Sequence, residues 1–344
     1  MADILRAQEI DDLVVGTLED LGRDKIVQIA QNNQDYEIYS HWFKKGKVAF
    51  DGGTGIKRTL MAKLPTAARH IGLYATDDVK LEDLLTSMSI EWRHATTNWT
   101  YETREMMMNK GKARINNIIK PRREGAVLNL IEQIETKCWS LPALTNETDP
   151  YGIPYWVVYN ATEGFTGAAP SGHTTVAGVN PTTYPTWKNW SANYTNVAKD
   201  DLIAKMRKGQ WSTKWKSPIN IGEFRGDKGS RYRFYTEYDV LAAFETLGEA
   251  QNENLGRDLA SMDGQMTFRR HPLIAVPELD GATGGPVYGI DHECFMAVCL
   301  EGDYLRESAP AVAPNQHNAR QCFIDLTYNL LCLDRRRQMI FRTA

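Results

Sequence analysis

The sequence has no long hydrophobic run and almost no excess of charge of one sign. No apolar stretch approaches the roughly 20 residues that a membrane-spanning helix needs. Residues 1–12 carry Asp3, Glu9, Asp11 and Asp12 where a signal peptide would be basic and then apolar. A formal net charge of −3 argues against bulk attraction to DNA or to an anionic membrane. We therefore expect a folded protein that is made in a cytoplasm and has no membrane partner.

Cysteines are few and odd in number, and no Cys-x-x-Cys pair is present. The five are Cys138, Cys294, Cys299, Cys322 and Cys332. This pattern indicates neither a disulfide framework nor a common zinc knuckle, so the thiols should be reduced and mostly buried. His292-Glu293 begins like a zinc-protease motif, but Met296 stands where the second imidazole would have to be.

Other catalytic patterns are also missing. The segment Gly52 to Lys57 lacks the Gly-Lys pair and the following helix of a phosphate-binding loop, so its glycines are interpreted as hairpin glycines. No Gly-x-Ser-x-Gly nucleophile elbow occurs. The sequence therefore predicts no catalytic residue, no cofactor-binding residue and no metal ligand.

The first half of the chain predicts four successive parts. Residues 1–30 have the pattern of one or two acidic amphipathic helices. A long basic hairpin follows, with alternation over Ile56 to Leu60, a stop at Pro65 and a return at His70 to Tyr74. Ser87 to Tyr101 alternates as one further strand. A helix then follows, which could begin in Met106 to Ile119 and kink at a proline.

The clearest helix comes after Pro121. Its apolar residues recur at helical spacing and form one stripe, namely Val127, Leu130, Ile131, Ile134 and Cys138. A stripe of this kind must be buried against another element.

The second half predicts an aromatic, loop-rich region and then mostly strands. Tyr151 to Trp187 has many turn residues and predicts short strands and ordered loops. Helices are predicted over Asp200 to Lys208 and Glu237 to Gln251, with Trp211 and Trp215 packed between them. The predicted strands are Met266 to Phe268, Leu273 to Val276, Pro286 to Ile290, Cys294 to Leu300 and Gln321 to Leu333. The fold class is therefore α+β.

Two basic clusters could contact nucleic acid or an acidic protein surface. One surrounds the long helix and contains Lys110, Lys112, Arg114, Lys120, Arg122 and Arg123. The other is Arg335-Arg336-Arg337. Salt bridges to an acidic neighbour, such as the amino-terminal arm of another subunit, are the favoured interpretation.

Several stretches resemble segments of the major capsid proteins of tailed bacteriophages. They are Tyr151-Gly-Ile-Pro-Tyr-Trp-Val-Val-Tyr-Asn-Ala-Thr-Glu-Gly-Phe, Asn252-Glu-Asn-Leu-Gly, Thr267-Phe-Arg-Arg-His-Pro, Pro286-Val-Tyr-Gly-Ile-Asp and Glu301-Gly-Asp-Tyr-Leu-Arg. The order of elements is also similar, and the capsid fold of this family is shared with encapsulins and the herpesvirus capsid floor.

The resemblance implies an N-terminal arm (1–44), an extended loop (45–86), a peripheral domain with a spine helix (87–140) and an axial domain (141–275). It also implies a return through the peripheral domain (276–330) and a final axial segment (331–344). Some relatives cross-link their subunits through a lysine, but nothing selects Lys57 or Lys63 for that role.

The implied function is structural: a virion subunit, not an enzyme, that forms hexamers and pentamers of an icosahedral DNA-filled head in the host bacterial cytoplasm. Expected partners are other copies, a scaffolding protein, a portal protein, a decoration protein and, by weak non-specific contact, packaged DNA. The residues expected at contacts between subunits are Lys45, Lys47, Lys57, Arg58, Asp11, Asp12, Arg122 and Arg123.

Two alternatives remain open from the sequence. A soluble α+β enzyme would need a pocket with convergent carboxylates or histidines. Another virion component is the second alternative: a decoration protein would usually be shorter, and a tail-tube protein would form rings or rods.

Overall fold

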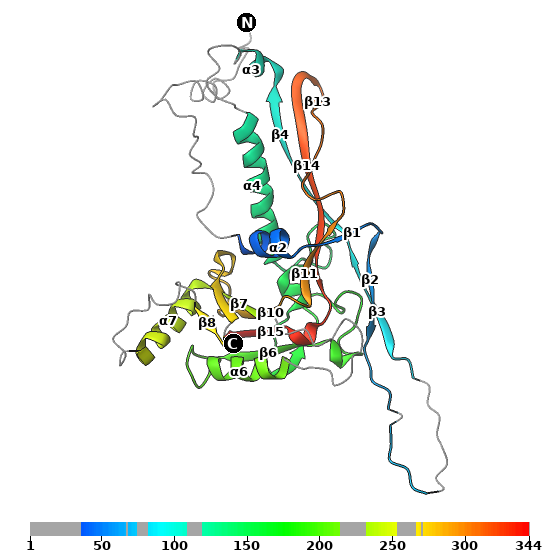
Figure 1. The fold of residues 1–344 in the computed structure, drawn as a ribbon, viewed down its shortest axis with the longest axis vertical. Coiled ribbons are helices and arrows are strands. Elements are labelled where there is room, and N and C mark those ends of the chain that lie inside the picture. The colour runs from blue at the N-terminus through cyan, green and yellow to red at the C-terminus, as the bar shows by residue number, and fades with distance from the viewer. Residues whose placement is uncertain are drawn as a thin grey trace.

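The computed structural model of the chain describes residues 36–66, 68–73, 82–108, 119–213, 232–252, 266–269 and 271–343. Within these residues the chain forms a six-stranded sheet, a seven-stranded sheet and a separate two-stranded hairpin. In Figure 1 the long helix lies beside the first sheet, and the second sheet and its helices lie below them. The hairpin extends away from both sheets. The α+β class predicted from the sequence is confirmed.

The first sheet is built around one long strand, β14 (Gln316–Cys332). Its other strands are β1 (Val48–Phe50), β4 (Arg93–Glu102), β11 (Phe295–Leu300), β12 (Arg306–Glu307) and β13 (Ala311–Ala313). β11 pairs with one end of β14, while β4 pairs with it from Ala319 to Tyr328. β14 therefore joins the body to a long extension, in which its outer part pairs with β4 and β13 (Figure 1).

The helix α4 (Ile119–Cys138) lies along β4, and the short α3 (Thr103–Met108) precedes it. The predicted apolar stripe is confirmed, because Leu130, Ile131, Ile134 and Cys138 are all buried. The part of the predicted helix over residues 109–118 lies outside the described residues.

The second sheet carries the smaller core. In spatial order its strands are β5 (Gly164–Gly167), β6 (Asn189–Tyr194), β15 (Met339–Thr343), β10 (Val287–Asp291), β7 (Tyr232–Thr236), β9 (His271–Ala275) and β8 (Thr267–Phe268). The helices are α6 (Leu202–Thr213) and α7 (Tyr238–Asn252), with short turns α5 (Ile153–Trp156), η3 (Pro185–Trp187), η7 (Pro277–Leu279) and η8 (Arg335–Arg337). The last strand of the chain is thus inserted between β6 and β10 and closes the sheet.

The hairpin pairs β2 (Gly55–Met61) with β3 (Leu85–Glu91). Two predictions were wrong here. The return strand is not His70 to Tyr74, since described residues 68–73 form no strand. Ser87 to Tyr101 is not one strand, because the strand is interrupted at Trp92. The indole N–H of Trp92 donates to the carbonyl of Gly53. Because of this interruption, β3 pairs with β2 in the hairpin while β4 pairs with β14 in the first sheet.

The strands predicted in the final third are confirmed with small shifts of their ends, and so are the two helices of the second sheet. The packing predicted for Trp211 is wrong, because its side chain is 80% exposed. Helix α6 buries Leu202, Met206 and Gly209, so Trp211 lies on the outer face. Trp215 lies outside the described residues.

Residues 36–46 span the end of the predicted arm and join it to the core of the body. The π-helical turn η1 (Ile38–Phe43) carries Ile38, Trp42 and Phe43, which are all buried, and the short α2 (Lys44–Gly46) follows with exposed residues. The acidic helices predicted for residues 1–30 lie outside the described residues. We call residues 36–46 the arm root.

Candidate assembly interface

Most residues of the hairpin beyond its base are exposed. Its register runs from Gly55 opposite Glu91 to Met61 opposite Leu85. One further hydrogen bond, from the amide of Ala62 to the carbonyl of Leu84 at 3.0 Å, continues the ladder past the strands. The backbone beyond it extends away from the body (Figure 1).

Burial along the hairpin changes with distance from the body. Near the body, Ile56, Met88 and Ile90 are buried. Farther out, large apolar side chains face solvent, namely Met61, Leu64, Ile71, Leu73 and Leu85. Leu73 is 94% exposed and Leu64 is 75% exposed. A two-stranded ribbon has no second layer to cover such residues, so they form a surface that another chain could bury.

Four of the predicted basic contact residues lie at two places, the end of α2 and the strand β2 of the hairpin. Lys45 and Lys47 flank the end of α2, and Lys57 and Arg58 lie on β2, with all four side chains exposed. The Lys47 ammonium lies 3.1 Å from the ring centroid of Tyr304. The role of these side chains between subunits stays a prediction.

Arg122 and Arg123, at the start of α4, already have partners within the chain. Arg122 forms an ion pair with Glu105 at 2.7 Å, and Arg123 pairs with Glu307 at 2.8 Å. The second pair joins α4 to β12 of the first sheet, and the first joins α4 to α3 at the far end of that sheet. Their contact with a second subunit stays a prediction, and Asp11 and Asp12 lie outside the described residues.

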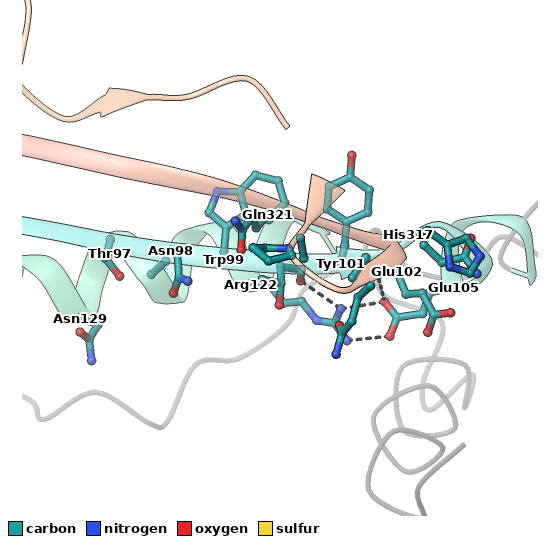
Figure 2. A pocket seen from close by; sticks show the side chains of 17 residues that line it. Thr97, Asn98, Trp99, Tyr101, Glu102, Glu105, Arg122, Asn129, His317 and Gln321 are labelled. Atoms are coloured by element: carbon teal, nitrogen blue, oxygen red, sulfur yellow. Dashed lines mark hydrogen bonds and ion pairs between the residues drawn. The ribbon is translucent and has the colours of Figure 1, made fainter. Parts of the chain in front are cut away.

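An open groove of about 1150 Å³ lies at this far end, between α4, β4 and the turn from β13 to β14. Figure 2 shows Arg122 reaching Glu105 across the groove. Trp99 and Tyr101 stack on each other with ring centroids 5.7 Å apart. Most of the lining residues are polar.

A buried carboxylate holds the arm root. Glu135 on α4 is 1% exposed and accepts hydrogen bonds from the amides of Ile38 and Tyr39 at 3.1 and 3.2 Å. The indole N–H of Trp139 donates to it at 3.0 Å. Burial raises the pKa of Glu135 to about 7, against the lowering effect of the three N–H donors. The arm root is therefore tied to the spine helix through one titratable group.

The second predicted basic cluster is not a basic surface, and this part of the prediction was wrong, because two of its three residues are buried and only Arg336 is partly exposed. Arg335 is fully buried and donates to the carbonyls of Trp156, Trp187 and Ala168 at 2.7 to 2.8 Å. Arg337 is buried against Asp291 at 3.3 Å. Neither guanidinium can reach DNA or the acidic arm of another subunit, because both are held inside the chain.

The histidine and cysteine segment is structural in the described residues. The imidazole of His292 hydrogen-bonds Tyr235 at 2.9 Å and lies edge-on to Trp42 with centroids 4.8 Å apart. All five cysteines are free and buried, as predicted. In the part of the chain that the structure describes, no group of three or more His, Cys, Asp or Glu side chains could hold a metal ion.

Sequence reasoning missed Glu135 and the contacts of the loop-rich region with the hairpin. A signal for Glu135 was available, because it lies directly beside Ile134 and Cys138 on the apolar stripe, where a charge requires partners. No local signal connects residues 170–187 to the hairpin, since the partners are about 100 residues apart.

No family model and no curated protein sequence matches the chain. Among the described residues, no helix is long and apolar enough to cross a membrane. Solved structures do match over nearly the whole chain. The capsid asymmetric unit of cyanophage A-1(L) has a TM-score of 0.64 at 11% identity, covering 94% of this chain and 98% of that one.

Two further matches have complete or nearly complete coverage. The capsid of Myoviridae phage XM1 has a TM-score of 0.53 at 11% identity, covering 100% of both chains. The SrpI encapsulin of Synechococcus elongatus PCC 7942 has a TM-score of 0.51 at 11% identity, covering 99% of this chain and 96% of that one. At such identities the similarity is one of fold.

Proposed function

We propose that this chain, which has the fold of phage capsid and encapsulin subunits, is the major capsid protein of an icosahedral double-stranded DNA phage head. In this proposal it is a structural protein and not an enzyme, and it assembles into hexamers and pentamers. The similarity of fold supports this reading over the whole length of the chain.

The exposed hairpin is the observation that carries the proposal. Leu64 and Leu73 have no covering layer in the described part of their own chain. Leaving such side chains in water costs roughly 25 cal/mol for each Å² of apolar surface that a partner could cover. A closed shell with rotational symmetry offers every copy the same neighbouring surface, so all hairpins can be covered at once.

Charge supports a specific docking direction. Lys57 and Arg58 make the base of the hairpin basic, and Lys45 and Lys47 add positive charge at the end of α2. The first twelve residues are acidic and include Asp11 and Asp12. We infer that the arm of one subunit meets the hairpin base of another, and that Arg122 and Arg123 extend this contact surface. Exposed ion pairs of this kind contribute at most about 1 kcal/mol each. They can therefore orient subunits and still allow a wrongly placed subunit to dissociate.

The proposal also includes a division into domains, a set of partners and a place of assembly. The domains would divide as an arm (1–44), an extended loop (45–86), a peripheral domain (87–140 and 276–330) and an axial domain (141–275 and 331–344). Scaffolding, portal and decoration proteins would be the partners in the virion, and packaged DNA would be contacted weakly. Assembly would take place in the cytoplasm of the host bacterium.

Electron microscopy of negatively stained protein tests the proposal. The protein should be expressed with and without the candidate scaffolding protein from the same genome. Closed shells, or rings of six and five subunits, are expected. A uniform small particle in both preparations would contradict the proposal and favour a soluble enzyme, whereas rods or tubes would indicate a tail component.

A pair of matched variants tests the role of the hairpin. Leu64→Ser with Leu73→Ser should give a folded subunit that no longer assembles, because the apolar contact is lost while no buried group changes. The control is Leu141→Ser with Leu144→Ser, whose side chains are also exposed but lie after the spine helix. Normal shells from the hairpin variant would remove the hairpin from the interface.

A further inference from the structure

The base of the hairpin is held by a loop from elsewhere in the chain. Residues 170–187, which we call the bracket loop, place Val176, Ala177 and Val179 in the same hydrophobic cluster as Met88 and Ile90 of the hairpin. The amide of Ser89 donates to the carbonyl of Ala177 at 3.0 Å. This bond uses the edge of β3 that does not face β2.

The turn that presents this carbonyl is strained. Val176 and Val179 exchange two backbone hydrogen bonds of 2.9 and 3.1 Å around Ala177 and Gly178. Both central residues have positive φ, 52° for Ala177 and 80° for Gly178. Positive φ suits glycine but costs about 1–2 kcal/mol for alanine. A strained residue persists only where its surroundings hold it, and here the amide of Ala177 also donates to the Tyr155 hydroxyl at 2.9 Å.

A second contact lies farther out on the hairpin. The hydroxyl of Thr186 donates to the carbonyl of Ala62 at 2.7 Å. The Lys63 ammonium lies 5.4 Å from the ring centroid of Tyr184. Because Ser89 is paired with Lys57, the two contacts are separated by five residues of strand, or about 17 Å. Two contacts at this spacing fix the angle between the hairpin and the body, whereas one contact alone would leave the hairpin free to pivot.

The bracket loop itself is fixed to the body. The indole of Trp187 donates to the carbonyl of Val176 at 3.2 Å, which closes the loop on itself. Buried Arg335 then holds the carbonyl of Trp187 at 2.8 Å. The hairpin base is therefore connected through the loop to the seventeen-residue-long strand β14 and the carboxy-terminal segment that follows it.

We propose that the bracket loop sets the direction in which the hairpin leaves the body, with Ala177 as the inner contact and Thr186 and Tyr184 as the outer contact. This inference rests on the proposed function in one respect: in a shell, the direction of the hairpin determines the angle between neighbouring copies. The loop is then a positioning element for assembly, and it need not touch the neighbouring subunit.

The direction of the hairpin can be measured in the unassembled full-length subunit. Spin labels are attached at Leu64→Cys on the hairpin and at Asp239→Cys at the start of α7, both exposed sites. The native cysteines are all buried and should label poorly, which a sample without the two new cysteines checks. The unchanged bracket should give a narrow distribution of distances between the labels.

The test variant removes the outer contact by Tyr184→Ala and Thr186→Val. The distance distribution should broaden and its mean should shift, while the circular dichroism spectrum stays the same. The control is Thr183→Val, which makes the same chemical change at another exposed position of the bracket loop. A distribution as narrow as that of the unmodified loop, with the same mean, would overturn the proposal.

Assembly of the same variants separates this inference from the proposed function. If the unmodified protein forms shells, the variant should give shells with a wider spread of diameters, or open sheets. A broadened distance distribution together with shells of unchanged diameter would refute the link to the intersubunit angle. Absence of shells from the unmodified protein would refute the proposed function, while the distance measurement would still decide whether the loop directs the hairpin.

Discussion

Two basic segments look alike in the sequence and differ completely in the fold. Lys57 and Arg58 lie on the hairpin with exposed side chains. Arg335 and Arg337 lie in the turn η8, between β14 and β15, with almost no exposed surface. The difference shows that local charge density does not identify a binding surface. A basic residue becomes structural when distant parts of the chain bring acceptors to it, and the hairpin has few such acceptors.

The largest effect is expected from Arg335→Met. The carbonyls of Trp156, Trp187 and Ala168 would lose their donor while remaining buried. Each buried acceptor without a partner costs about 1–3 kcal/mol, so the free energy of unfolding should fall by about 4 kcal/mol or more. Urea unfolding of the unassembled subunit, or loss of soluble protein, measures this.

The control is the neighbouring residue. Arg336 is partly exposed, and its guanidinium carbon lies 4.6 Å from the ring centroid of Phe165. Arg336→Met should therefore cost only about 1 kcal/mol. Equal decreases in the free energy of unfolding at Arg335 and Arg336 would contradict the expected difference between a buried, hydrogen-bonded arginine and a partly exposed one.

An intermediate effect that depends on pH is expected at Glu135. Its pKa is raised from 4.5 to about 7 in the folded state, so folding favours the protonated form. The stabilisation from proton uptake is complete below about pH 4.5 and is lost as pH rises through about 7. The shift corresponds to about 3 kcal/mol.

The measurement compares the unmodified protein with Glu135→Gln, whose side chain does not titrate. Unfolding free energies are determined from pH 4 to pH 8. The difference, unmodified minus variant, should decrease with rising pH, because contributions of all other groups cancel to first order. A constant difference would mean that the three N–H donors fully offset burial, so that the pKa of Glu135 is the same in the folded and the unfolded chain.

The elements of the body could be predicted where the pattern was local. The stripe Val127 to Cys138 predicted α4, because burial of one helix face imposes a period that a single segment records. Strand-like segments between turn signals predicted β11 and most of β14. The hairpin was also predicted, as a basic ribbon without a core. The return strand of the hairpin was predicted at the wrong place. His70 to Tyr74 has a strand-like pattern as Leu85 to Glu91 does, and the sequence pattern alone does not show which of the two segments pairs with β2.

The contacts that join distant segments could not be predicted in this way. Arg335 is held by carbonyls of residues that precede it by about 150 to 180 positions. The outer contact of the bracket loop joins Ala62 to Thr186. Such bonds depend on where loops lie after folding, and nothing in Tyr151 to Trp187 beyond its aromatic content indicates them.

The smallest effect on stability, and the sharpest on assembly, is expected from reversing charge on the hairpin. Lys57→Glu with Arg58→Glu changes two exposed side chains, so the free energy of unfolding should change by no more than about 0.5 kcal/mol for each. Shell formation should nevertheless fail or become strongly dependent on salt, because the acidic arm would then meet an acidic surface. The matched control is Lys199→Glu with Arg207→Glu, which makes the same net change at exposed positions on the second sheet's side of the molecule. Electron microscopy and sedimentation of both variants decide the matter: assembly lost in both would reflect net charge alone, and assembly retained in both would exclude the hairpin charges from the interface.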